Sequence, residues 1–151
     1  MLKVIIDTNV LIDAMEDNFS YTWKIIDLVL QGKIKAVASD KILRENRLIV
    51  ERNIARKDDR QKLEKFFANI EIIQVNKKVQ VIKDDPEDNK FIECADEIKA
   101  DYIISSDAHL LQLEKYKHTK ILRPKDFWYE YSGKEKDGDE WKEVFKNILD
   151  G

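Results

Sequence analysis

The sequence has very few residues that could form disulfides or bind zinc. It contains one cysteine, Cys94, so no disulfide can form within the chain. With Cys94, His109 and His118 as its only thiol and imidazole groups, it has no cluster suited to structural zinc. Any metal ion bound here would be held by oxygen atoms.

Long apolar runs are also missing. No run approaches the ~20 residues of a membrane span, and Met1 leads into a strand-like segment without a cleavable signal pattern. We therefore expect a cytoplasmic protein. With 43% hydrophobic and 38% charged residues, the chain is typical of a globular protein with a charged exterior. We expect one domain over residues 1–131, followed by a linker and a helix over residues 132–151.

The net charge of -3 argues weakly against a nucleic-acid partner, because proteins that bind phosphates usually carry an excess of basic residues. This argument weakens if four acids belong to a metal site. The other 26 of the 30 acidic residues would then face 27 basic ones. The bulk charge therefore does not exclude a polyanionic substrate.

Short β-branched runs alternate with longer segments of helical period. Strands are expected at residues 3–7, 34–39, 71–75, 102–106 and 119–122. Helices are expected at residues 20–31, 40–54, 58–70 and from after Pro86 to residue 98. A helical turn or two should follow Asp7, a short helix should follow Asp107, and a proline-led turn should precede residues 126–131. This alternation predicts a three-layer α/β/α fold with a central parallel sheet.

The end of the chain carries an apolar helical stripe. After the link SGKEKDGD, the stripe consists of Trp141, Val144, Phe145, Ile148 and Leu149. It packs either on its own domain or against a second copy or a small partner protein.

Acidic residues follow the expected strands at places where a buried chain ends. Asp7 ends the run Val4-Ile5-Ile6, where an unpaired carboxylate would be costly to bury. Asp107 ends a second strand, Glu45 lies about one turn into a helix that follows another, and Asp88 opens a helix. Because ligands bind beyond the carboxyl ends of strands in such sheets, the four acids could converge on a divalent cation.

Each acid alone also has a structural explanation. Asp88 and Asp107 could stabilise helix starts, and Glu45 could lie on a solvated face. We assign Asp40 and Asp85 capping and turn roles first. The joint placement of the other four acids carries the functional interpretation.

Four ordered blocks of the sequence resemble a known family. IIDTNVLIDA, the RE pair in ILRENRLI, DDPEDNKFIECA and YIISSDAHLL together look like the PIN-domain ribonucleases, particularly the stand-alone branch grouped with toxins of toxin-antitoxin pairs. The resemblance spans residues 1 to about 128. It implies an acidic quartet at Asp7, Glu45, Asp88 and Asp107, which would bind metal and carry catalysis.

The resemblance also assigns a supporting role to Asn9 and marks one departure. Many relatives carry a second acid two residues after the last one, where this chain has His109. Imidazole is a poor ligand for magnesium and a fair one for manganese, so the metal preference is open.

The family implies cleavage of single-stranded RNA that depends on one or two Mg²⁺ or Mn²⁺ ions, with an antitoxin protein and a homodimer as possible partners. Lys41, Arg44 and Arg47 lie on the helix of Glu45 and could contact RNA phosphates. The alternative is a non-catalytic PIN-like domain that binds RNA or protein. A haloacid-dehalogenase phosphatase would need a second Asp where Asn9 stands, and a receiver domain would need an Asp after residues 71–75.

Overall fold

The computed structural model describes residues 1–16, 20–53 and 57–133, and in this part of the chain six strands form one sheet in the order β3-β2-β1-β4-β6-β5. The strands are β1 (Lys3–Ile6), β2 (Lys35–Ser39), β3 (Glu71–Ile73), β4 (Tyr102–Ile104), β5 (Lys115–Tyr116) and β6 (Thr119–Leu122). Neighbours pair in parallel except β5, which runs antiparallel to β6. The predicted parallel sheet is confirmed, with an antiparallel edge strand that the sequence pattern did not indicate.

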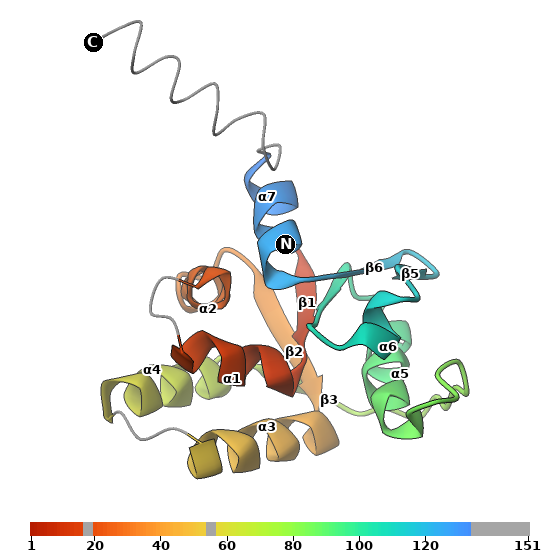
Figure 1. Cartoon of the computed structure of the whole chain (residues 1–151), viewed down its shortest axis with the longest axis horizontal. Helices are drawn as coiled ribbons and strands as arrows, with labels where there is room; N and C mark the ends of the chain where they lie inside the picture. The colour runs from red at the N-terminus through yellow and green to blue at the C-terminus, as the bar shows by residue number, and fades with distance from the viewer. Residues whose placement is uncertain (17–19, 54–56, 134–151) are drawn as a thin grey trace, which may run out of the picture.

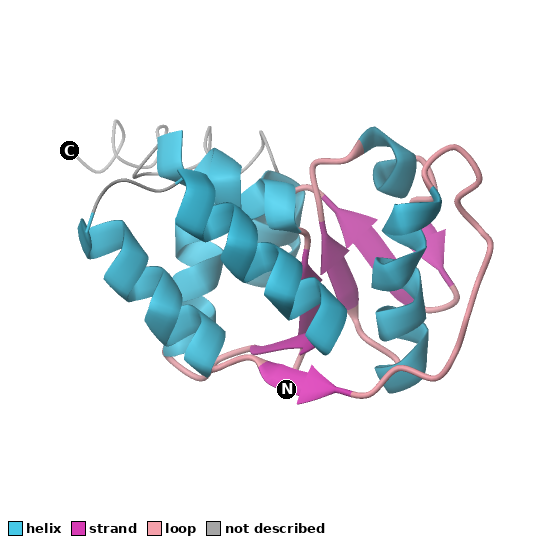
Figure 2. Cartoon of the chain, turned by 90° about the horizontal axis from the view of Figure 1, so that it is seen from below, coloured by secondary structure: helices cyan, strands magenta, loops and turns pink. Residues whose placement is uncertain are grey.

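Helices cover both faces of the sheet. They are α1 (Thr8–Glu16), α2 (Tyr21–Leu30), α3 (Asp40–Asn53), α4 (Lys57–Ala68), the 3-10 helix η1 (Pro86–Asp88), α5 (Asn89–Ile98), α6 (Ala108–Leu111) and α7 (Pro124–Ser132). The helices α1 to α4 lie on one side of the strands, and α5 and α6 lie on the other (Figure 1, Figure 2). The three-layer architecture is therefore confirmed. No helix in the described ranges is long and apolar enough to span a membrane.

Local side-chain contacts explain where several helices begin. The Ser20 hydroxyl accepts from the Trp23 N–H at the start of α2, and the Ser39 hydroxyl accepts from the Ile42 N–H at the start of α3. Gly32 follows the end of α2 with a positive φ of 72°, a conformation that glycine adopts without strain. These contacts agree with the predicted boundaries to within two residues.

The proline-led turn near residue 124 continues into a full helix. Pro124 occupies the first turn of α7, where its missing N–H costs no hydrogen bond. Phe127 is fully buried and packs edge-on against Tyr102, with 5.1 Å between ring centroids. The predicted C-terminal helix falls on residues 134–151, outside the described residues, so it stays a prediction.

The centre of the sheet places the ends of two strands side by side. In β1 and β4, Val4, Ile5, Ile103 and Ile104 are fully buried, as expected for central strands covered on both faces. The chain proceeds from β1 to β2 and β3 on one side, then crosses to β4 and β6 on the other. The strand order thus reverses between β1 and β4, which is where ligands bind in open α/β sheets.

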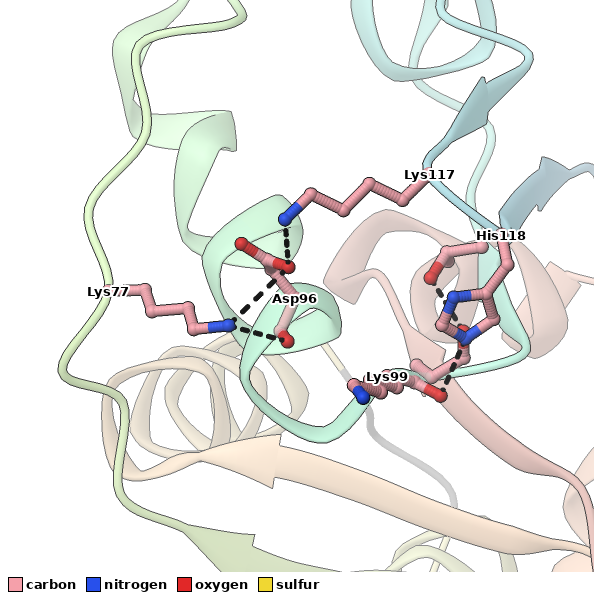
Figure 3. Close-up of polar contacts among 7 residues, drawn as sticks. Lys77, Asp96, Lys99, Lys117 and His118 are labelled. Carbon is pink, nitrogen blue, oxygen red and sulfur yellow. Dashed lines mark hydrogen bonds and ion pairs between the residues drawn. The ribbon is translucent and has the colours of Figure 1, made fainter.

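Asp96, near the C-terminal end of α5, makes polar contacts with two lysines from other segments (Figure 3). Asp96 accepts a hydrogen bond from Lys117 at 2.8 Å and pairs with Lys77 at 3.6 Å. The bond from Lys117 holds the pKa of Asp96 below its usual range. In the same region a His118 ring nitrogen lies 3.0 Å from the Lys99 carbonyl oxygen. These contacts tie α5 to the β5–β6 hairpin and to the segment after β3.

Candidate active site

Asp7 is the first residue after β1 and lies at the point where the strand order reverses. Its N–H donates to the carbonyl oxygen of Ile104 at 2.9 Å, which continues the pairing of β1 with β4. The carboxylate is only 4% exposed and accepts from the Ser105 hydroxyl at 2.7 Å and the Asn9 N–H at 3.4 Å. Burial raises the pKa of Asp7 against these hydrogen bonds.

Asp107 is joined to Asp7 through Ser105. The Ser105 hydroxyl donates to Asp7 and accepts from the Asp107 N–H at 2.9 Å. The Asp107 carboxylate caps α6 by accepting from the N–H groups of His109 and Leu110, at 2.8 and 3.4 Å. Asp107 therefore has the capping role that the sequence allowed, and it also lies in the carboxylate cluster.

Asp88 is presented by η1 at the start of α5. Its side chain makes no capping hydrogen bond to α5, the residue is only 9% exposed, and no residue of the described chain donates to its buried Oδ2 atom. Burial, followed by the negative charges of Asp107, Asp85 and Asp7, raises the pKa of Asp88 to about 7. Such an acceptor is either protonated or bound to a cation.

Asp85 joins this cluster, although we had assigned it a turn role first. Within the described ranges, Asp85, Asp88, Asp107 and His109 each offer one ligand atom, and these atoms lie within 4.8 Å of one another. Asp85 and Asp88 are three residues apart in a 3-10 turn, where such side chains share one face. The acidic run DDPED was the signal that could have indicated Asp85.

These four groups suit a divalent cation. Three carboxylates and an imidazole form a mixed oxygen and nitrogen donor set, and Asp88 Oδ2 is a buried acceptor that lacks a donor in the described residues. Asp7 is not in this group, but its negative charge acts on Asp88, and that of Asp107 acts on Asp7. The residues therefore fit a metal-binding role.

Glu45 lies near the cluster but pairs with a residue that the sequence analysis missed. Its carboxylate forms an ion pair with Lys90, which is the second residue of α5 and has only 8% of its side chain exposed. The charge of Lys90 lowers the pKa of Asp7, so Lys90 acts on both acids. A lysine in the first turn of a helix interacts unfavourably with the positive end of the helix dipole. The position of Lys90 could therefore have indicated a nearby anion.

Two buried amides hold the elements that carry the site. The Thr8 hydroxyl donates to the side-chain amide oxygen (Oδ1) of Asn46, which links α1 to the turn of α3 that bears Glu45. The Asn89 side chain accepts from the Ile82 N–H at 2.9 Å and donates to the carbonyls of Ile82 and Pro86, at 3.0 and 3.1 Å. Asn89 thereby fixes the segment that carries Asp85 and Asp88.

The predicted RNA-binding residues already have acidic neighbours. Lys41 pairs with Glu87 at 3.4 Å, Arg44 with Asp40 at 3.0 Å, and Arg47 with Glu64 at 3.6 Å. Arg47 also packs on the Phe67 ring, 5.3 Å from its centroid. Of the three, Lys41 lines a cavity of about 270 Å³ whose lining also includes Lys77, Lys78 and Lys90. Asn9 is exposed beside Asp7 and contacts it through its backbone N–H.

Comparison with known proteins agrees with this geometry. A PIN domain family model matches residues 3–109. The uncharacterized protein MJ1680 of Methanocaldococcus jannaschii is 34% identical to this chain over an alignment that covers 86% of this chain and 92% of that relative. A chain of VapBC2 from Rickettsia felis, bound to a DNA fragment from their promoter, shares the fold with a TM-score of 0.54 and 13% identity, over 80% of this chain and 97% of that one.

The family match and the structural likeness support the resemblance inferred from the four sequence blocks. At 13% identity, the likeness to VapBC2 shows a common fold and no more. The match to the family model spans most of the chain, and it includes the segments of Asp7, Glu45, Asp88 and Asp107. The chain therefore belongs to the PIN domain family.

Proposed function

We propose that this protein is a metal-dependent endoribonuclease that cleaves single-stranded RNA and acts as the toxin of a toxin-antitoxin pair. PIN domains are generally nucleases, and the described part of this chain retains a cluster of acidic residues. The observation that carries the proposal is Asp88 Oδ2, a buried acceptor without a donor in the described chain, beside Asp85 and Asp107. A merely structural loop gains nothing from mutually repelling carboxylates in such a place.

In this proposal Asp88, Asp107, Asp85 and His109 hold a Mg²⁺ or Mn²⁺ ion, with Asp7 beside them. The bound ion supplies Lewis-acid chemistry, by activating water and neutralising charge on the phosphate. The chain contributes the orientation of its ligands. Ser105 fixes the Asp7 carboxylate by a hydrogen bond of 2.7 Å, and the Asp107 carboxylate is fixed by the N–H groups of α6.

The raised pKa of Asp88 fits this role. With a pKa of about 7, the Asp88 carboxyl retains a proton for part of the time at neutral pH. Binding of a cation would release that proton, because metal ligands bind in their deprotonated form. The same charge repulsion that raises the pKa would then favour the metal-bound state.

The substrate strand would approach along the start of α3. Lys41, Lys77 and Lys78 line the 270 Å³ cavity beside Lys90, and lysine side chains there can contact successive phosphates. Arg44 and Arg47 are less available to bind RNA, because Arg44 pairs with an acid of its own helix and Arg47 packs against α4. Lys41 is therefore the first RNA-binding candidate, followed by Arg44 and Arg47.

The toxin role rests on the resemblance of the sequence blocks to the toxin branch of the family. An antitoxin protein is then the expected partner, and a homodimer is compatible with the same family. The apolar stripe of residues 141–149, outside the described residues, packs either on its own domain or against one of these partners.

The test is cleavage of end-labelled single-stranded RNA with Mg²⁺, Mn²⁺ or EDTA. Wild type should cut only with a divalent ion, and Asp88→Asn should abolish cutting. The matched control is Asp58→Asn, which removes an exposed acid in the first turn of α4 and should leave cutting unchanged. Cleavage that survives Asp88→Asn would place the activity elsewhere. A fully folded wild type that binds RNA without cutting it would favour the non-catalytic alternative.

A further inference from the structure

Lys90 is a buried cation at an unfavourable place in its helix. It is the second residue of α5, where the positive end of the helix dipole disfavours an ammonium group, and its side chain is only 8% exposed. Burying an ammonium without a partner is strongly unfavourable, so its position must be stabilised by nearby anions. Glu45 and Asp7 provide them.

The pairing of Lys90 with Glu45 restricts what Glu45 can bind. If the Glu45 carboxylate became a ligand of a divalent ion, the buried ammonium would lose its ion-pair partner. The ammonium and a metal ion therefore compete for one carboxylate. Because the positive charge of Lys90 also acts on Asp7, the ammonium lies near two carboxylates, those of Glu45 and Asp7.

The candidate metal ligands form a group that does not include Glu45. In the described ranges, the group of converging ligand atoms comprises Asp85, Asp88, Asp107 and His109 and does not include Glu45. Nucleases with two ions hold them roughly 3.5–4 Å apart and need carboxylates around both. Here one group of four ligand atoms converges, whereas Glu45, which a second ion would need, is paired with Lys90.

We propose that this site holds a single divalent ion at the Asp85, Asp88, Asp107 and His109 group, and that the Lys90 ammonium occupies the place of a second ion. This inference rests on the proposed nuclease function and specifies its substrate contacts. Lys90 also lines the 270 Å³ cavity. The N–H groups of its ammonium that do not bond to Glu45 can therefore donate to a phosphate oxygen of RNA. Glu45 is then a positioning residue that holds Lys90.

The experiment counts bound ions without measuring catalysis. The full chain is titrated with Mn²⁺, by calorimetry and by the paramagnetic resonance signal of free Mn²⁺. Wild type should bind one ion. Lys90→Met removes the charge at similar length and frees Glu45, so this variant should bind two ions, with the spectrum of a coupled pair. Lys90→Met combined with Glu45→Gln should return to one.

Two conservative variants keep the test decisive if Lys90→Met fails to fold. Lys90→Arg retains the charge and should still bind one ion. Glu45→Gln should also bind one ion, with affinity within about threefold of wild type, whereas Asp88→Asn should lose more than tenfold. Circular dichroism in EDTA checks the fold of each variant.

The outcomes separate this inference from the proposed function. Two ions bound by wild type, or loss of the ion in Glu45→Gln, would overturn the single-ion assignment and leave a metal-dependent nuclease intact. One ion in both wild type and folded Lys90→Met would show that Lys90 does not occupy a second position. No ion bound by wild type would overturn both proposals together.

Discussion

Ser105 donates a hydrogen bond of 2.7 Å to the buried carboxylate of Asp7, across 98 residues of sequence. The same hydroxyl accepts from the Asp107 N–H at 2.9 Å. A single small side chain thus sets the spacing of two acids at the point where the strand order reverses. Four predictions follow from this cluster and its charges.

Replacing Ser105 with alanine should destabilise the protein by about 1–2 kcal/mol, because both Asp7 Oδ2 and the Asp107 N–H lose their hydrogen bond to the buried Ser105 hydroxyl. Urea unfolding at pH 7 measures this change in the free energy of unfolding. The control is Ser106→Ala, where an exposed hydroxyl bonds Asp13 at 3.2 Å and should contribute less than about 0.5 kcal/mol. Equal effects in the two variants would contradict the bridging role.

The stability of the metal-free protein should fall between about pH 4 and pH 7. The pKa of Asp88 is about 7 in the folded protein, against an ordinary value of 3.8, so the folded state binds this proton more tightly. The resulting stability is present at pH 4 and declines as the pH rises through 7. It is on the order of 2 kcal/mol, about half of what the full pKa difference would give, because solvent screens part of the charge. Urea midpoints in EDTA measure it. Asp88→Asn should flatten this pH dependence and Asp58→Asn should retain it.

Asp7→Asn should raise the melting temperature in EDTA while abolishing cleavage. Burial and the charge of Asp107 both raise the pKa of Asp7, so a neutral amide relieves an unfavourable charge. A gain of 1 kcal/mol corresponds to roughly 2–4 °C for a domain of this size. Differential scanning calorimetry gives the shift, with Asp13→Asn as the exposed control. A lower melting temperature would mean that the carboxylate is not under electrostatic strain.

His109→Asp should shift the metal preference from Mn²⁺ toward Mg²⁺. Imidazole suits transition metals, whereas carboxylate oxygen suits both ions, so the wild type should gain more thermal stability from Mn²⁺ than from Mg²⁺ at equal concentration. In the variant, the ratio of the Mg²⁺ dissociation constant to the Mn²⁺ dissociation constant should fall at least threefold. The control is His118→Asp, which lies between β5 and β6 and contacts the Lys99 carbonyl at the C-terminal end of α5. An unchanged preference would place His109 outside the metal site.

Much of the fold could be predicted because it depends on local pattern. The β-branched runs around Val4 and Ile103 and the capping residues Ser20 and Ser39 lie where the sheet and its helices required them. The edge strand β5 is only two residues long, too short for any periodic signal. The sequence predicts only a proline-led turn where α7 begins, because the aromatic residues there indicate burial but show no helical period.

The candidate site was only partly accessible to the same reasoning. Asp7, Asp88 and Asp107 each follow a strand or precede a helix, so the spacing of elements indicated them. Asp85 shares a face with Asp88 only because the segment forms a 3-10 turn. Ser105 and Lys90 act through contacts with residues 98 and 45 positions away, which no local pattern encodes.

The sequence by itself determined the parallel sheet, through the hydrophobic period of its segments, and the membership in the PIN domain family, through the four ordered blocks whose resemblance also singles out Asp7, Glu45, Asp88 and Asp107. Only the tertiary structure decided how those acids are divided: Asp88 and Asp107 lie with Asp85 and His109, whereas Glu45 lies with Lys90. The division arises from burial, since the pKa of a carboxylate and the partner it keeps depend on which distant charges share its low-dielectric surroundings.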